Sequence, residues 1–304
     1  ETRGREVKQF FSIRGQRYPY PTFSLDGVWQ KEFHETPYIF SASDIKSIKV
    51  IRSSAMLLTG IADMAGVINI ETRDYEKTET DYELDYGSFN SFRGHISHGS
   101  KIDNISYSLG LGYRTTNGPA NKNAAENISS FFGKVAWRPA PQLKIQTSAI
   151  YLEGKRELAR AVSPAANKFQ QQLEVFDPMA STMLTAKAVF SPSEQLSTEL
   201  KISFANRVPT YEMYNAKSGA AARYKEKDHE FNAGLIQALS IGNSNTLRLG
   251  LIYNKWAAPE GKRFYYGKPC DTETFAGVLV DEHKFGRLLV DAGLRYERTL
   301  LNEY

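Results

Sequence analysis

The sequence predicts a small α+β domain over residues 1–74, followed over residues 79–304 by the wall of an antiparallel transmembrane β-barrel. Short strand and helix patterns are mixed in the first part, whereas segments of about ten residues with alternating apolar and polar side chains fill the second. The connections between these segments alternate between short and long, and aromatic residues collect at their ends. These three observations carry the fold prediction.

The composition excludes several other classes. No stretch approaches 18 consecutive apolar residues, so no transmembrane helix is predicted, while strands with a single lipid-facing side fit the mean hydropathy of −0.44. The 38 basic and 34 acidic residues are mixed along the chain, and no basic block indicates a nucleic-acid partner. Cys270 is the single cysteine, so it either forms a disulfide with a cysteine outside this sequence or is a free thiol. The sequence starts at Glu1 and shows no signal peptide, and we expect an internal part of a longer protein.

The first domain is predicted to consist of short elements joined by turns. Phe23–Trp29 should form two strands around an Asp26-Gly27 turn. Ser43 is predicted to cap a short helix that has Asp44 in its first turn. A strand over residues 48–52, a helical turn over 55–58 and a strand over 67–72 should follow.

The second part is predicted to contain strands at 79–87, 92–99, 104–114, 128–138, 142–152, 180–190, 195–205, 228–239, 245–254, 274–283 and 287–297. Odd-numbered strands end in an aromatic residue on the apolar side: Tyr86, Tyr113, Tyr151, Phe204, Tyr253 and Tyr296. Two even-numbered strands end in Trp137 and Phe190. Aromatic rings at both ends are typical of strands that cross a membrane. A soluble all-β sandwich is the competing interpretation.

Motifs in the first domain resemble a known family. Ile13-Arg14-Gly15, Leu25-Asp26-Gly27, Ser43-Asp44-Ile45, Ile48–Arg52 and Ala65–Ile70 follow one another with the order and spacing of the plug domain of TonB-dependent outer-membrane receptors. The resemblance implies about 11 of roughly 22 barrel strands, and hence a wall with two open edges. It also implies a bacterial outer-membrane location among lipid, and energised uptake of a scarce extracellular ligand, most often a ferric siderophore. The inner-membrane TonB complex would act through a segment before the plug.

The resemblance also implies site residues. Arg14 and Arg52 match plug arginines that pair with carboxylates of the barrel wall, for which Glu199 and Glu297 are candidates. Loops at the plug apex would meet the ligand, and the long barrel loops would contact it from above; each of these side chains could instead pack within its loop. The apex candidates are Arg17, Tyr18, Tyr20, Trp29, Phe33 and His34, and the loop candidates are Tyr211, Tyr214 and Arg223.

No catalytic motif occurs in the sequence, so we expect no enzyme, cofactor or metal site. His95 and His98 are three apart on a predicted strand and should face opposite sides, so they cannot bind one metal together. The alternatives that stay open are an importer of carbohydrate or another nutrient in the same family, a signalling receptor, and a passive porin or structural adhesin barrel.

Overall fold

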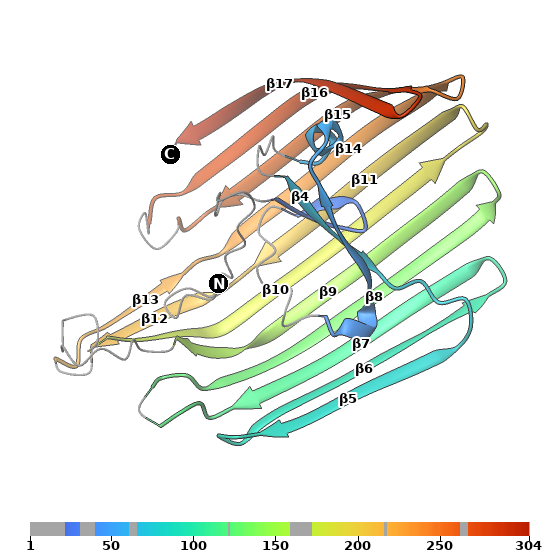
Figure 1. Cartoon of the computed structure of the whole chain (residues 1–304). Helices are drawn as coiled ribbons and strands as arrows, with labels where there is room; N and C mark the ends of the chain where they lie inside the picture. The colour runs from blue at the N-terminus through green and yellow to red at the C-terminus, as the bar shows by residue number, and fades with distance from the viewer. Residues whose placement is uncertain are drawn as a thin grey trace.

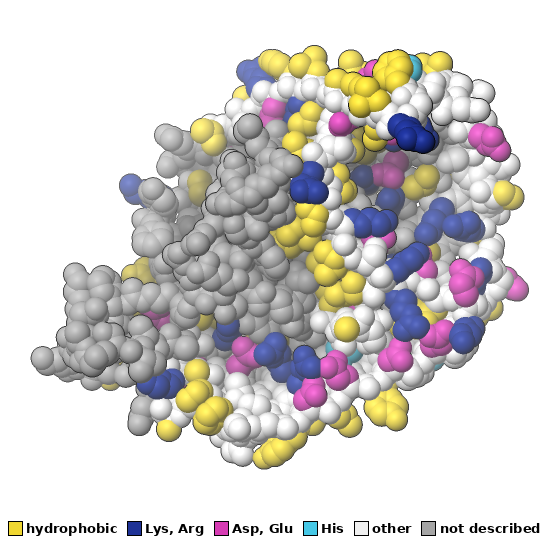
Figure 2. All heavy atoms as spheres, viewed as in Figure 1, with side chains coloured by type: hydrophobic (Ala, Val, Ile, Leu, Met, Phe, Trp, Pro, Cys, Tyr) yellow, Lys and Arg dark blue, Asp and Glu magenta, His cyan; other side chains and the backbone are white. Residues whose placement is uncertain are grey.

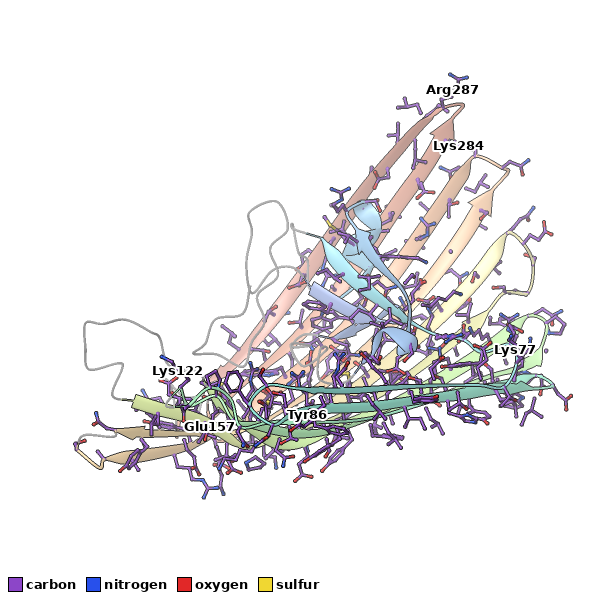
Figure 3. All side chains as sticks on the ribbon, turned by 60° about the horizontal axis from the view of Figure 1, so that its bottom comes forward. Lys77, Tyr86, Lys122, Glu157, Lys284 and Arg287 are labelled. Atoms are coloured by element: carbon purple, nitrogen blue, oxygen red, sulfur yellow. The ribbon has the colours of Figure 1, made fainter. Side chains whose placement is uncertain are left out.

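The alternating segments form one large antiparallel sheet that bends into an open trough (Figures 1 and 3). The computed structural model describes residues 22–30, 40–60, 66–120, 122–158, 172–215, 218–261 and 267–303. No helix in these residues is long and apolar enough to span a membrane. The wall strands are β5 (Glu79–Gly87), β6 (Ser91–Ile102), β7 (Ile105–Thr116), β8 (Glu126–Ala140), β9 (Leu143–Leu158), β10 (Gln172–Phe190), β11 (Leu196–Arg207), β14 (Asp228–Ile241), β15 (Asn245–Ala258), β16 (Cys270–Phe285) and β17 (Leu288–Glu303).

These strands pair in chain order from β5 to β17, and β12 (Thr210–Asn215) and β13 (Ala221–Lys225) form a hairpin on β10. Every predicted strand overlaps an observed one. The two edge strands do not pair with each other in the described sheet, which is therefore open along both edges, as predicted.

Several strands run further toward the long connections than predicted. On β9 the outward residues Glu153, Lys155 and Glu157 are polar, so the apolar alternation ends, although pairing with β10 continues as far as Leu158. Backbone hydrogen bonding does not depend on side-chain polarity. The pairing of β9 with β10 therefore continues beyond the residues whose apolar alternation predicts a strand. Figure 3 places Glu157 at this end of the wall, with Lys284 and Arg287 at the short-turn end.

The outer face of the wall is apolar. Leu251 and Tyr86 are 65% and 78% exposed, which is unusual for large hydrophobic side chains that face water. Cross-strand aromatic pairs run along this face near the long-connection end: Tyr86–Phe92, Phe92–Tyr113, Phe131–Tyr151, Phe204–Phe231, Phe231–Tyr253 and Tyr253–Phe275. Trp137 and Phe190 are exposed toward the other end. An apolar band bordered by aromatic rings is typical of lipid contact.

The inner face carries charged and small polar side chains, and charges of both signs gather on the concave side (Figure 2). A second, four-stranded sheet lies within the trough, with strand order β2-β1-β4-β3 (Figure 1). We call it the inner sheet. Its elements are β1 (Thr22–Leu25), β2 (Val28–Gln30), the 3₁₀ helix η1 (Ala42–Asp44), β3 (Ile45–Ile51), the 3₁₀ helix η2 (Ser54–Leu58) and β4 (Val67–Thr72).

The turns of the inner sheet follow from local chemistry. Asp26 and Gly27 connect β1 and β2 with φ angles of 50° and 81°, which Asp-Gly tolerates. The predicted cap at Ser43 is wrong. Ser41 occupies the N-cap position, its backbone N–H donates to Asp44 Oδ2 at 2.9 Å, and the helix ends at Asp44 because the β-branched strand β3 begins at once. The helical turn predicted over 55–58 is present as η2.

Candidate functional site

The inner sheet is seated on the wall by four sets of contacts, and the first is the β1–β2 turn. Asp26 accepts hydrogen bonds from the Thr72 backbone N–H at 2.8 Å and from Gln146 Nε2 of β9 at 3.0 Å. Its carbonyl accepts from Lys187 Nζ of β10 at 3.3 Å. Asn69 Oδ1 receives the Gly27 N–H at 2.9 Å. One aspartate therefore joins the turn, strand β4 and the wall.

The second set of contacts surrounds Asp44, which is fully buried. Ser97 of β6 donates to its Oδ1 at 2.6 Å, and His95 Nε2 lies 2.7 Å from its Oδ2. His95 Nε2 is close to the carboxylate but is not aligned to donate a hydrogen bond to it. Gly110 leaves room for the carboxylate, since a Cβ there would lie 3.1 Å from Oδ1. His98 faces the other side and contacts Tyr107, so the two histidines do point apart, as predicted.

The third set of contacts holds η2. Leu57 and Leu58 point at Gly293 of β17 and Gly250 of β15, where a Cβ would come within 2.6 and 2.7 Å of the leucine methyl carbons. Arg295 Nη1 donates to the Leu57 carbonyl at 2.8 Å. The Ser54 backbone N–H donates to Asp291.

The fourth set of contacts is made by the segment that connects the inner sheet to β5. Asp74 pairs with Lys134 of β8 at 2.7 Å, and the Tyr75 ring covers Gly99 of β6. Burial by itself would raise the pKa of Asp74, but the ammonium groups of Lys134 and Lys144 outweigh it and hold that pKa below its usual value. The Asp74 carboxyl is therefore ionised at neutral pH.

This pair makes stability depend on pH. Because the folded pKa of Asp74 is lowered, its contribution is complete above the ordinary aspartate pKa of about 3.9 and is lost as the pH falls through the folded value. Asp74→Asn in the full-length protein should cost about 1–2 kcal/mol at pH 7, mostly by leaving the buried Lys134 unpaired, and less at pH 3. Thermal unfolding in detergent at both pH values measures this. Asp103→Asn, in an exposed turn, is the control, and an equal loss at pH 3 would contradict the assignment.

No protein-family model and no curated protein matches the sequence. Among solved structures, the siderophore receptor PiuA from Acinetobacter baumannii matches with a TM-score of 0.73 and 12% identity, over 98% of this chain and 55% of its own. The chain has the fold of the TonB-dependent outer-membrane receptors. The FrpB iron transporter from Neisseria meningitidis gives 0.73 and 11%, over 98% and 54%. The alcaligin outer-membrane receptor FauA from Bordetella pertussis gives 0.70 and 14%, over 93% and 48%.

The chain thus spans about half the length of the receptors it matches. The similarity confirms, at the level of the fold, the resemblance that the motifs indicate.

The predicted site residues fall into three groups. Arg14, Arg17, Tyr18, Tyr20, Phe33 and His34 lie outside the described residues.

The second group lies at the inner sheet. Trp29 is buried, its indole ring stacks on Gly60, and its carbonyl accepts from Ser203 of β11 at 3.4 Å. In this receptor fold its side chain packs between the sheet and the wall, and a role in ligand contact stays a prediction. Arg52 is exposed and pairs with no carboxylate among the described residues. The suggested wall partners have other neighbours there: Glu199 pairs with Lys187 at 3.2 Å, and Glu297 pairs with Arg295 at 2.6 Å.

The third group lies on the β12–β13 hairpin. Tyr211 is buried against Phe176, with ring centroids 5.3 Å apart, and so packs the hairpin. Tyr214 and Arg223 border a surface hollow of about 450 Å³, and Arg223 pairs with Glu212 at 3.0 Å. These two side chains are accessible for contact. Their binding role is untested.

The residues that seat the inner sheet were missed as a group. Asp26 and Asp44 belong to the quoted motifs, and the spacing from Ser41 to Asp44 fits a capping box, so a signal was present. Lys134 and Arg295 appear in the sequence only as charges on the inward side of predicted strands. Their partners are distant in sequence and could not be assigned from it.

Proposed function

We propose that this chain is part of a TonB-dependent outer-membrane receptor, in which the inner sheet belongs to the plug and the large sheet to the barrel. The observation that carries the proposal is the combination of an apolar outer face with a folded sheet seated on a polar inner face. A passive porin has no need for a buried Asp44 that joins such a sheet to its wall. A soluble sandwich would not expose Leu251 and its neighbours to water.

The proposed cargo is a ferric siderophore or related iron complex. Support comes from the relatives in fold, since PiuA is a siderophore receptor and FrpB an iron transporter. The aromatic and cationic composition of 16–22 and 30–38 suits ligands that offer aromatic rings or negative charge. Under this proposal the TonB complex supplies the energy, and Arg14 and Arg52 help to lock the plug to wall carboxylates.

Deleting residues 1–75 from the complete gene tests the proposal. Cells with the intact protein should take up ⁵⁵Fe from at least one member of a panel of ferric hydroxamate and catecholate siderophores, in an energy-dependent way. The deletion should abolish that uptake and admit vancomycin, because it opens the barrel. Unchanged permeability after deletion would instead identify a passive porin, and equal growth on every iron source with and without the gene would exclude the siderophore proposal.

A further inference from the structure

The β12–β13 hairpin extends the wall beyond its aromatic row at the long-connection end (Figure 1). Glu157, Val175, Glu212 and Arg223 stand directly opposite one another on β9, β10, β12 and β13. Residues that are directly opposite on paired strands project from the same face of a sheet. Because Glu157 projects outward, Glu212 and Arg223 do so as well, and Tyr214, two residues beyond Glu212, shares their face. This side of the hairpin therefore faces away from the interior of the trough.

The other side of the hairpin is packed and holds it in place. Tyr211 is 1% exposed, and the centroid of its ring lies 5.3 Å from that of Phe176 on β10 and 6.2 Å from that of Tyr224 on β13. Pairing with β10 also continues from Gln172 to Phe176. The outward side chains of the hairpin are therefore presented from a backbone that is fixed by packing and by strand pairing.

The surface hollow of about 450 Å³ lies on this outward side. Its volume falls within the range of about 300–1,000 Å³ that is usual for sites that bind small molecules. Leu173 and Val175 give it an apolar lining, and the ring of Tyr214, which is 45% exposed, stands at its border. The hollow thus offers an apolar surface and one accessible aromatic ring to a ligand.

Charges of both signs border the hollow. Arg223 pairs with Glu212 at 3.0 Å, Lys155 pairs with Asp177 at 3.0 Å, and Glu157 adds a further carboxylate. Each cation is matched by a carboxylate, so no excess of positive charge favours a phosphate ligand here. Carboxylates accept hydrogen bonds, whereas guanidinium and ammonium groups donate them. This mixture suits an uncharged ligand that carries many hydroxyl groups.

The height of the hollow above the apolar band identifies the layer beside it. Glu157 lies six residues beyond Tyr151, the aromatic residue of β9. At about 3.3 Å per residue and a strand tilt of roughly 40°, this separation corresponds to about 15 Å along the membrane normal. The headgroup region of a bilayer is only roughly 5–8 Å thick on each side. Among membrane lipids, only one with a taller headgroup than a phospholipid would therefore reach the outward face of the hairpin.

We propose that this hollow binds the oligosaccharide headgroup of a glycolipid in the outer leaflet. Tyr214 packs against the apolar face of a sugar ring, and Glu212 and Arg223 exchange hydrogen bonds with its hydroxyl groups. The inference rests on the proposed receptor function, because it requires the apolar band to lie in the outer membrane. The same outward surface then meets acyl chains at the level of Leu251 and sugars at the level of the hairpin, which ties the hairpin to the membrane surface.

Hydrogen exchange of the full-length protein in vesicles tests this site. Three compositions are compared: phospholipid alone, phospholipid with lipid A, and phospholipid with lipopolysaccharide that keeps its core sugars. The core sugars should slow exchange of the amides of β12 and β13 by about fivefold relative to the other two compositions. Equal slowing by lipid A would show that phosphate or acyl chains make the contact, and would overturn the oligosaccharide headgroup as the ligand. Equal exchange in all three compositions would overturn the site.

Two substitutions and a matched control locate the contact. Tyr214→Ala and Glu212→Gln should each remove at least about half of the protection that the core sugars give. Glu273→Gln breaks an outward ion pair of the same kind, with Lys255 at 2.7 Å, and should leave this protection unchanged. An equal loss in the control, or protection of the hairpin by the ferric siderophore panel in place of the core sugars, overturns the glycolipid site while the receptor proposal stands. A protein that does not float with the vesicles contradicts the receptor proposal itself.

Discussion

Gly60→Ala should destabilise the inner sheet by about 3–5 kcal/mol, the range for losing a buried large aromatic contact. A Cβ at residue 60 would lie 2.1 Å from Cδ2 of Trp29, far inside van der Waals contact with the indole ring. The ring cannot retreat easily, because Trp29 is 5% exposed and Val28 and Gln30 are equally buried beside it. Limited trypsin digestion of the full-length protein in detergent should cut the inner sheet faster, and cells should become sensitive to vancomycin.

Gly242→Ala is the matched control for this prediction. Gly60 and Gly242 have φ angles of +62° and +61°, so alanine pays the same left-handed backbone cost of about 1 kcal/mol at both. At Gly242, however, no atom lies within 4 Å of the added Cβ. The difference between the two variants thus isolates the contact with Trp29. Equal behaviour would mean that Trp29 does not hold the inner sheet in place.

The wall strands could be predicted from sequence because their signal is local. Alternation in β17 or β15 is visible within ten neighbouring residues, and each register follows from which residues form the apolar outer face. The Asp26-Gly27 turn is likewise encoded in two adjacent residues. The loop-end extension of β9 was missed because polar outward residues end the apolar alternation while backbone pairing continues, and that of β10 was missed because an irregularity between Phe176 and Met179 interrupts the period of two.

The seating contacts lie beyond this local signal. Asp44 meets His95 and Ser97, more than fifty residues away, and nothing in either segment specifies the other. A glycine within a strand is expected to weaken that strand. In the structure, three such glycines each make room for an inner-sheet side chain: Gly110, Gly250 and Gly293. The sequence predicted the cap at Ser43, whereas the pairing of β3 with β4 from Ile45 onward confines the helix to Ala42–Asp44 and leaves Ser41 at the N-cap.

Leu251→Arg should cost about 2–4 kcal/mol if the apolar outer face contacts lipid, the range for a cation near the bilayer midplane on a barrel. Leu251 projects outward from the middle of β15, where Leu235 and Gly277 stand opposite it on the two neighbouring strands. In a water-soluble sheet the same change at a side chain that is 65% exposed would shift stability by less than about 0.5 kcal/mol. The two environments therefore predict clearly different outcomes.

Urea titration of the full-length protein folded into phospholipid vesicles measures this difference. Asn127→Arg is the depth control, because it faces outward from β8 beyond the aromatic pair Phe131–Tyr151 and should cost at most about 1 kcal/mol. A large loss at residue 251 together with a small one at 127 means that the apolar band is a lipid-contacting surface bounded by the aromatic row. Small losses at both positions would show that water reaches the outer face. The apolar band would then have no lipid to contact, and the result would contradict the outer-membrane receptor proposal.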